Sequence, residues 1–181
     1  MGSYLNPGNK GFQESLNSEI YVDKTGLIEK TNEVLDTRQK FLCVSRPRRF
    51  GKSMAADMLA AYYERGEDSA ELFGTLKISK VESYEKNRNQ YDIIKVNMQE
   101  FLSMTHSMDE MLSMLQKYLI FDLTDHFDNV RFRDENNLIQ VMKDIYSKTK
   151  HSFVILIDEW DCLFREYQQD QEAQKKYLDF L

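Results

Sequence analysis

The chain has 181 residues, of which 41% are hydrophobic and 30% are charged, and its mean hydropathy is −0.60. This length is enough for one hydrophobic core, so we expect a single domain over residues 1–181. No apolar stretch approaches the roughly 18 residues of a membrane-spanning helix, and the N-terminus lacks a secretory signal pattern, so we expect a cytoplasmic protein without a membrane partner. The net charge of −6 argues against a general nucleic-acid-binding surface.

The first predicted elements lie before residue 40. Residues 1–13 contain proline and glycine and are expected to be irregular. Tyr21–Lys24 follows as a short extended segment. Thr25 then suits the N-cap of a helix that ends near Leu35, because a threonine hydroxyl accepts a hydrogen bond from a free N–H of the first turn.

A phosphate-binding loop is predicted after these elements. The apolar run Phe41–Val44 has the length and bulk of a buried strand, and Met54–Tyr63 consists of strong helix formers. Between them lies Arg46–Ser53, which reads RPRRFGKS. In such a loop, backbone N–H groups and the positive end of the helix dipole face the phosphate oxygens. Lys52 would then reach the β and γ phosphates, and Ser53 would coordinate Mg²⁺.

The loop departs from the pattern GxxxxGK[ST]. Arg46 stands at the first glycine position, and Pro47 removes an N–H that would face a phosphate. An ordinary basic turn is therefore the alternative interpretation. The arginines suit a triphosphate, a nucleic-acid backbone, a carboxylate partner or a solvated turn. The predicted nucleotide-binding residues are Arg46, Arg48, Arg49, Phe50, Gly51, Lys52, Ser53 and Met54.

A third strand is predicted at Tyr91–Met98. Polar residues follow its end, where the ligand crevice of an α/β sheet lies. Asn97 or Glu100 would assist a metal ion or a water molecule there, or form a turn.

Two amphipathic helices are predicted next. Ser107 and Glu110 form a capping box for the first helix. Its buried stripe is Met108, Met111, Leu112, Leu115, Leu119 and Leu123. The second helix begins at Asp134 or Asn136. Its apolar face is Leu138, Ile139, Met142, Ile145 and Tyr146.

An apolar run, Phe153–Ile157, ends in two carboxylates, Asp158 and Glu159. An all-apolar strand predicts a parallel sheet covered on both faces, with its ligand site beyond the carboxyl ends of the strands. Asp158 is therefore predicted to bind Mg²⁺, and Glu159 to polarise the attacking water, as a catalytic residue together with Lys52. A solvated acidic turn is the alternative.

The chain ends in the largely apolar segment Tyr177–Leu181. Exposed apolar residues at a chain end indicate a contact. We expect this segment to dock on the open edge of the domain's own sheet, or to form a contact surface for a second molecule.

Cysteine and histidine usage excludes other chemistries. Cys43 and Cys162 lie in or beside the two motif strands, and we expect buried, reduced thiols. The three histidines lack the spacing of zinc ligands, so Mg²⁺ is the only metal that we predict.

Three blocks resemble the predicted AAA-ATPase-like family of prokaryotes in kind and in order: YVDKT at Tyr21–Thr25, RPRRFGKS at Arg46–Ser53 and IDEWD at Ile157–Asp161. The resemblance implies an α/β P-loop NTPase fold of the AAA class, three layers with a mainly parallel sheet flanked by helices. It also implies that arginine at the first glycine position of the loop is a family trait.

The resemblance gives the first block a place beside the nucleotide. Tyr21, Asp23 and Lys24 are then candidates for base or ribose contacts. A docking element with one ion pair is the alternative.

The resemblance covers only the front part of the family's ATPase domain, because the chain stops at Leu181. The later sheet strands, the lid and an arginine-bearing segment are then missing. The open sheet edge would pair with a protein partner or a second copy of the chain. An arginine finger contributes about 10³–10⁵ in rate, so we expect hydrolysis to be slow or absent.

Two functions are therefore predicted. The first is a domain that binds ATP or ADP with Mg²⁺ and hydrolyses weakly or not at all. The alternative is a non-enzymatic interaction or inhibitor protein on the same truncated scaffold, acting on a larger complex such as one that handles nucleic acid. Any role with nucleic acid would then be indirect.

Overall fold

The computed structural model describes residues 4–45 and 50–181, and it divides the chain into two compact units. We call Asn6–Ile93 with Ser152–Val154 the N-terminal unit, and Met1–Leu5 with Ile94–His151 and Ile155–Leu181 the C-terminal unit. Each unit is described by itself, and the single domain expected over residues 1–181 stays a prediction.

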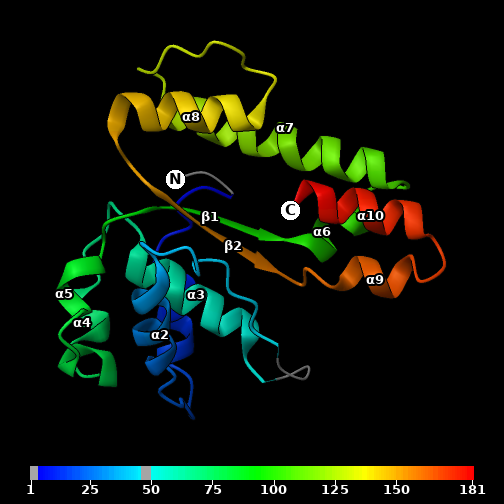
Figure 1. Cartoon of the computed structure of the whole chain (residues 1–181). Coiled ribbons are helices and arrows are strands. Elements are labelled where there is room, and N and C mark those ends of the chain that lie inside the picture. The colour runs from blue at the N-terminus through cyan, green and yellow to red at the C-terminus, as the bar shows by residue number, and fades with distance from the viewer. Residues whose placement is uncertain (1–3, 46–49) are drawn as a thin grey trace. The chain divides into compact units, whose positions relative to one another are not determined.

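The N-terminal unit contains short helices (Figure 1). They are α1 (Lys10–Leu16), α2 (Gly26–Val34), α3 (Lys52–Tyr63), α4 (Ala70–Phe73), the 3₁₀ helix η1 (Lys77–Lys80) and α5 (Tyr84–Asn87). The predicted helices that follow Thr25 and the GKS triplet are thus confirmed as α2 and α3, the second starting two residues early.

The helices of the C-terminal unit are α6 (Met98–Met104), α7 (Met108–His126), α8 (Leu138–Thr149), α9 (Cys162–Glu166) and α10 (Gln171–Phe180). Two strands, β1 (Asp92–Asn97) and β2 (Phe153–Asp158), begin in the N-terminal unit and continue in the C-terminal unit. They pair with each other and run in the same direction (Figure 1). The protein is therefore a mixed α/β structure with a small parallel sheet. Among the described residues, no helix is both long enough and apolar enough to span a membrane.

The core of the N-terminal unit is aromatic. Phe12 of α1 stacks on Phe73 of α4 with ring centroids 4.8 Å apart, and Tyr62 of α3 meets Phe73 edge-on. The buried phenol oxygens have partners, since Tyr62 donates to the Tyr84 carbonyl at 2.7 Å and Tyr63 donates to Asn32 Oδ1 at 2.7 Å. These hydrogen bonds allow polar rings to fill a core without leaving a polar atom unsatisfied.

The core of the C-terminal unit follows the predicted helix stripe. All six residues of the α7 stripe are buried. The capping box is confirmed in part: the Ser107 hydroxyl accepts from the Glu110 N–H at 3.2 Å, while the Glu110 carboxylate accepts from the N–H of His106 instead of that of Ser107. Helices α7 and α8 pack against each other (Figure 1).

The start and the apolar face of α8 differ from the prediction. The helix begins at Leu138 after an Asn137 cap, whose side chain accepts from the Gln140 N–H at 3.0 Å. Val141 and Ile145 are buried, whereas Ile139 and Tyr146 are 65% and 52% exposed. The predicted face was displaced around the helix, since it included Ile139 and Tyr146 and left out Val141, and a helix buries the stripe that meets its neighbour.

Two predictions about strands are wrong. Phe41–Val44 forms no strand and is exposed, Phe41 by 85%, and Cys43 is therefore not buried. In β2, Ile155 and Ile157 are 52% and 37% exposed, so this strand is not covered on both faces. The reason is the size of the sheet: over the described residues it has two strands, and an apolar segment is buried only where neighbouring strands and helices cover it.

The C-terminal segment divides between core and surface. Tyr177 of α10 is fully buried and donates to the Trp160 carbonyl at 3.0 Å, and Lys176 forms a salt bridge with Asp109 of α7. Leu178 and Leu181 are 54% and 50% exposed. The segment therefore docks within its own unit and also leaves apolar surface open.

A buried carboxyl group makes the stability of the N-terminal unit depend on pH. Glu64 is 3% exposed and accepts a hydrogen bond from the Gly8 N–H at 2.7 Å. Burial, with smaller contributions from Glu67 and Asp92, raises the pKa of Glu64 to about 7. The folded chain thus holds a proton that the unfolded chain releases near pH 4.5. The free energy of unfolding should therefore fall as the pH rises from about 4.5 to 7.

We expect Glu64→Gln to remove this dependence. The variant should be more stable than the parent by about 1–3 kcal/mol at pH 8 and equal to it at pH 5, because the amide carries no charge to bury. Urea unfolding at both pH values measures the difference, with the exposed Glu71→Gln as the matched control. Parallel pH curves for Glu64→Gln and the parent would contradict the assignment.

Candidate functional site

The GKS triplet lies at the start of α3. Gly51 has φ 76°, a left-handed conformation that favours glycine, and its carbonyl accepts the first hydrogen bond of the helix from Ala55 at 3.0 Å. Lys52 and Ser53 are the first two residues of this twelve-residue helix. Their backbone N–H groups thus belong to the helix N-terminus, where the dipole favours an anion.

The other residues of the predicted loop are placed in part. Phe50 and Met54 flank the triplet and are 62% and 41% exposed. The three arginines of the prediction lie outside the described residues. They are Arg46, Arg48 and Arg49.

A hollow of about 290 Å³ opens beside this helix start. Apolar and aromatic side chains make most of its wall, and Lys24 and Gly51 lie at the wall as well. Its lining residues are Phe12, Ile20, Tyr21, Val22, Lys24, Phe50, Gly51, Met54, Ala55 and Met58. The Tyr21 ring meets Phe12 edge-on at 6.2 Å. A small apolar hollow with a few polar groups is the usual form of a ligand pocket.

Sequence reasoning predicted Tyr21 and Lys24 near a ligand and missed Phe12, Ile20, Val22 and Met58. The signal available was the apolar run Ile20–Val22 directly before two charged residues. Ile20 is 81% exposed and Val22 is 63% exposed, so this run lies at the surface and not in the core.

Hydrogen bonds to the side chains of Asp23 and Thr25 hold the YVDKT segment in place. Asp23 Oδ1 accepts from the Thr25 N–H at 2.9 Å and from the Thr25 hydroxyl at 2.6 Å, and its Oδ2 accepts from the Lys77 N–H at 2.8 Å. The Thr25 oxygen in turn accepts from the Ile78 N–H at 3.1 Å. Burial acts to raise the pKa of Asp23, but these hydrogen bonds outweigh it and lower that pKa. We call Asp23, Thr25 and η1 the DT clamp.

The DT clamp corrects one prediction. Thr25 precedes α2, but its side chain makes no cap hydrogen bond to that helix. The hydroxyl instead links Asp23 to η1, and Thr25 is fully buried. The Thr25 hydroxyl therefore stabilises the tertiary structure and does not cap α2.

Lys24 lies between the two clamp residues and reaches the GKS segment. Its Nζ donates to the Phe50 carbonyl at 2.7 Å. A Cβ added at Gly51 would lie 2.9 Å from the same Nζ, so a side chain at Gly51 would displace the ammonium group. The structure thus brings the first and second motif blocks together.

The acidic block forms the end of β2. Asp158 is the last residue of the strand, and its Oδ1 accepts from the Glu159 N–H at 2.9 Å. Glu159 has φ 51°, which is strained for a residue with a side chain. Strain of this kind gathers at functional sites.

Arg165 of α9 binds two carboxylates of this block. Its Nη2 lies 2.8 Å from Glu159 Oε2, and its Nη1 lies 2.9 Å from Asp161 Oδ2. The side chains of Glu159 and Arg165 are 26% and 33% exposed. The carboxylate of Glu159, predicted to be the catalytic base, is therefore in an ion pair with the guanidinium group of Arg165.

The remaining candidates near strand ends have structural contacts. Asn97 caps α6 by accepting from the Gln99 N–H at 2.9 Å. Glu100 accepts from the Tyr4 hydroxyl at 3.0 Å. Burial raises the pKa of the Cys162 thiol to about 11, so this buried cysteine stays protonated at neutral pH.

The two halves of the predicted site belong to different units. Lys52 and Ser53 lie in the N-terminal unit, and Asp158 and Glu159 lie in the C-terminal unit. Their convergence on one ligand stays a prediction. Within residues 4–45 and 50–181, no group of three or more His, Cys, Asp or Glu side chains is arranged to hold a metal ion. The predicted Mg²⁺ donors, a serine hydroxyl and one carboxylate, are oxygens of the kind that this ion takes together with phosphates and water.

A family model described as Predicted AAA-ATPase matches residues 8–181. No curated protein and no solved structure matches the chain.

We predict that the DT clamp is worth more than an ordinary surface hydrogen bond. Thr25→Val keeps the shape of the side chain but leaves the Ile78 N–H buried without its acceptor, which costs about 1–3 kcal/mol. Thr37→Val, which removes an exposed hydroxyl bonded to the Val34 carbonyl, should change stability by less than about 0.5 kcal/mol. Urea unfolding of both variants provides the measurement. Equal losses would mean that the clamp does not stabilise the fold.

Proposed function

The chain belongs to the predicted AAA-ATPase family, and we propose that it binds ATP or ADP with Mg²⁺ through a P-loop and hydrolyses ATP slowly or not at all. One observation carries the proposal: a glycine in the left-handed conformation opens a twelve-residue helix whose first residues are lysine and serine. That helix start also borders a hollow with aromatic walls. We therefore propose adjacent sites for phosphate and base in the same unit.

The phosphates are proposed to lie at the N-terminus of α3. The first N–H groups of a helix have no partner within it and donate to an anion readily. Lys52 would bind the β and γ phosphates, and Ser53 would bind Mg²⁺ with its hydroxyl. Arg46, Arg48 and Arg49 precede this point in the sequence and are proposed to hold the rest of the polyphosphate.

The base is proposed to enter the hollow beside α3. Its walls include the rings of Phe12, Tyr21 and Phe50 and the thioether of Met54. Aromatic and apolar side chains bind the faces of a purine by stacking and dispersion.

The acidic block is proposed to serve the metal and the water. Asp158 would complete the Mg²⁺ shell, and the ion would neutralise charge on the phosphate oxygens. Glu159 would accept a proton from the attacking water. The ion pair between Glu159 and Arg165 supports slow turnover, because the carboxylate must leave the guanidinium group before it can contact the attacking water.

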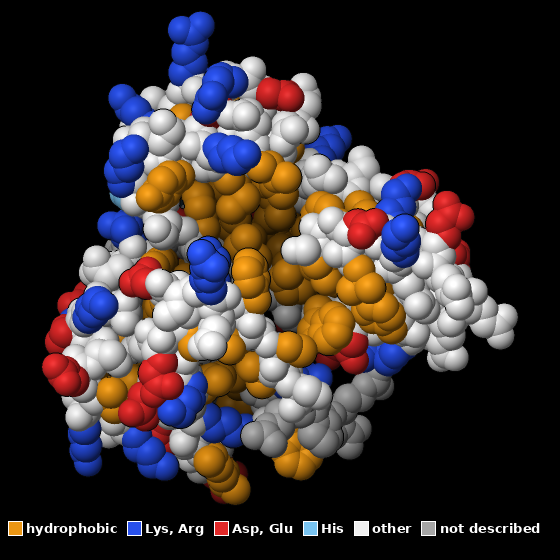
Figure 2. Space-filling model, in the orientation of Figure 1, with side chains coloured by type: hydrophobic (Ala, Val, Ile, Leu, Met, Phe, Trp, Pro, Cys, Tyr) orange, Lys and Arg blue, Asp and Glu red, His pale blue; other side chains and the backbone are white. Residues whose placement is uncertain are grey.

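A second function is favoured by a separate observation. Apolar side chains are exposed in the segment before the loop and at the chain end: Phe41, Leu42, Val44, Leu178 and Leu181. Figure 2 shows that hydrophobic side chains reach the surface on the face drawn. An interaction or inhibitor protein that engages a larger complex would use such surfaces. Partner capture that survives Lys52→Ala would favour this second function.

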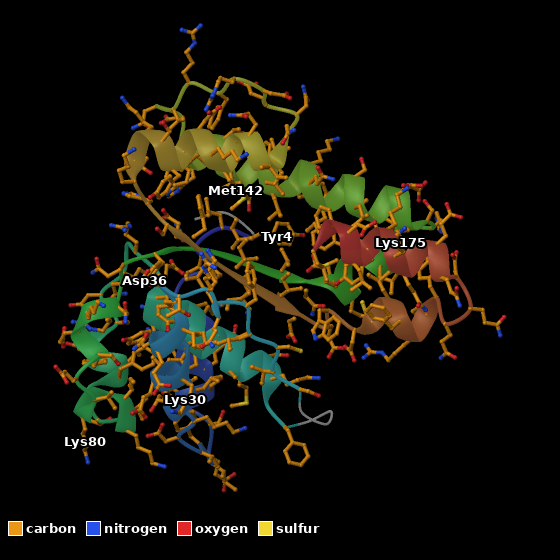
Figure 3. The ribbon with its side chains drawn as sticks, viewed as in Figure 1. Tyr4, Lys30, Asp36, Lys80, Met142 and Lys175 are labelled. Carbon is orange, nitrogen blue, oxygen red and sulfur yellow. The ribbon has the colours of Figure 1, made fainter. Side chains whose placement is uncertain are left out.

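We expect Lys52→Ala to weaken the binding of ADP and ATP by at least about tenfold, because it removes a charge-assisted contact with the phosphates. Calorimetric titration with and without Mg²⁺ gives the affinities. Lys80→Ala is the matched control, since Lys80 is an exposed lysine of the same unit, at the end of η1 (Figure 3). A parent protein without measurable nucleotide affinity would end the proposal.

The rate of ATP hydrolysis should depend on the ion pair between Glu159 and Arg165. Arg165→Ala should raise the rate of ATP hydrolysis several-fold by releasing the carboxylate, and Glu159→Gln should abolish this gain in the double variant. The exposed Arg131→Ala serves as the control in the same unit. If Glu159→Gln hydrolyses ATP as fast as its parent, Glu159 is not the base.

A further inference from the structure

The Lys24 ammonium group contacts a neutral acceptor at the surface. Its Nζ donates an exposed hydrogen bond to the Phe50 carbonyl, and holding a lysine side chain in one rotamer costs conformational entropy that offsets part of this bond. The carbonyl is neutral, so the ammonium charge stays available to an anion.

The backbone around Lys24 is fixed much more strongly than its side chain. Asp23 and Thr25, its two neighbours, are both held by the DT clamp, and Thr25 is fully buried. Lys24 is thereby carried on a rigid segment with its ammonium group at the start of α3. A cation that approaches a helix N-terminus is unfavourable unless an anion lies between them.

Gly51 provides room for the ammonium group. A Cβ at Gly51 would approach Lys24 Nζ to 2.9 Å, and φ 76° at Gly51 already disfavours a side chain. Lys24 and Gly51 also line the same hollow. The charge thus lies where the proposed base pocket meets the proposed phosphate site.

We propose that Lys24 is a second phosphate-binding lysine, which exchanges the Phe50 carbonyl for a phosphate oxygen of the bound nucleotide. The proposal rests on the function proposed above and assigns Lys24 to the phosphates instead of the base or ribose. The exchange gives the ammonium group a charged acceptor in place of a neutral one, and Coulomb attraction to the phosphate makes it favourable. No new backbone movement is needed, because the clamp already positions the residue.

The test compares ligands that carry phosphate with one that does not. ADP, inorganic tripolyphosphate and adenosine are titrated into the parent chain and into Lys24→Ala, Lys24→Arg, Lys24→Met, Lys52→Ala and Lys80→Ala. Lys24→Met keeps the apolar stem and removes only the charge. Unfolding midpoints verify that each variant is folded, as expected for an exposed side chain.

We expect Lys24→Ala and Lys24→Met to weaken the binding of ADP and of tripolyphosphate by about tenfold. The affinity for adenosine should stay unchanged. Lys24→Arg should retain most of the affinity, and Lys80→Ala all of it. The dependence of log Kd on log salt should also become shallower in Lys24→Met, which a purely structural support would not change.

Each other outcome overturns the proposal. If Lys24→Met binds tripolyphosphate and ADP as tightly as the parent while Lys52→Ala loses affinity, Lys24 does not bind the phosphates. The proposed function would then still hold. An equal loss for adenosine and ADP means that Lys24 shapes the pocket and does not bind phosphate. A parent chain that binds none of the ligands removes the proposed function and this inference with it.

Discussion

The candidate site depends on the hydrogen bonds that fix the YVDKT segment against η1. One carboxylate, Asp23, binds the backbone N–H groups of Thr25 and Lys77, and the Thr25 oxygen binds the N–H of Ile78. The segment is thereby held beside the start of α3, which places Tyr21 in the wall of the hollow and Lys24 at the Phe50 carbonyl. Two further contacts add to this constraint, since Lys24 donates to the Phe50 carbonyl and the Tyr21 ring meets Phe12. The short motif therefore combines two roles, since Asp23 and Thr25 position it and its other residues face the site.

The small sheet is the second constraint. A parallel strand is buried only if other strands and helices cover it, and over the described residues β1 and β2 form the whole sheet. The exposed Phe41–Val44 segment and the exposed faces of Ile155 and Ile157 share this cause. Both carry the composition of buried strands, so their surfaces are suited to further contacts. This is why the two proposed functions do not exclude each other: nucleotide binding uses the start of α3, and partner binding would use exposed apolar segments elsewhere.

In the acidic block, Glu159 has both a strained backbone and a charge pair. Glu159 has a positive φ directly after β2, and its carboxylate is paired with Arg165 of the helix that follows. The guanidinium group therefore holds this carboxylate against α9. Cys162 is buried in the same segment as a protonated thiol, so it adds packing and not reactivity.

The sequence by itself determined the elements whose signals are local. The α7 stripe, the Ser107 cap, β1, β2 and the helix after the GKS triplet follow from periodicity, capping chemistry and residue type, which act over a few neighbouring residues. The family also follows from short motifs in a fixed order. Only the tertiary structure decided that Thr25 binds η1 instead of capping α2, that Lys24 reaches Phe50, that Glu159 pairs with Arg165, and that Phe41–Val44 is exposed. The physical reason is that a hydroxyl, an ammonium group or an apolar run can satisfy several partners, and folding selects among them by bringing distant segments together.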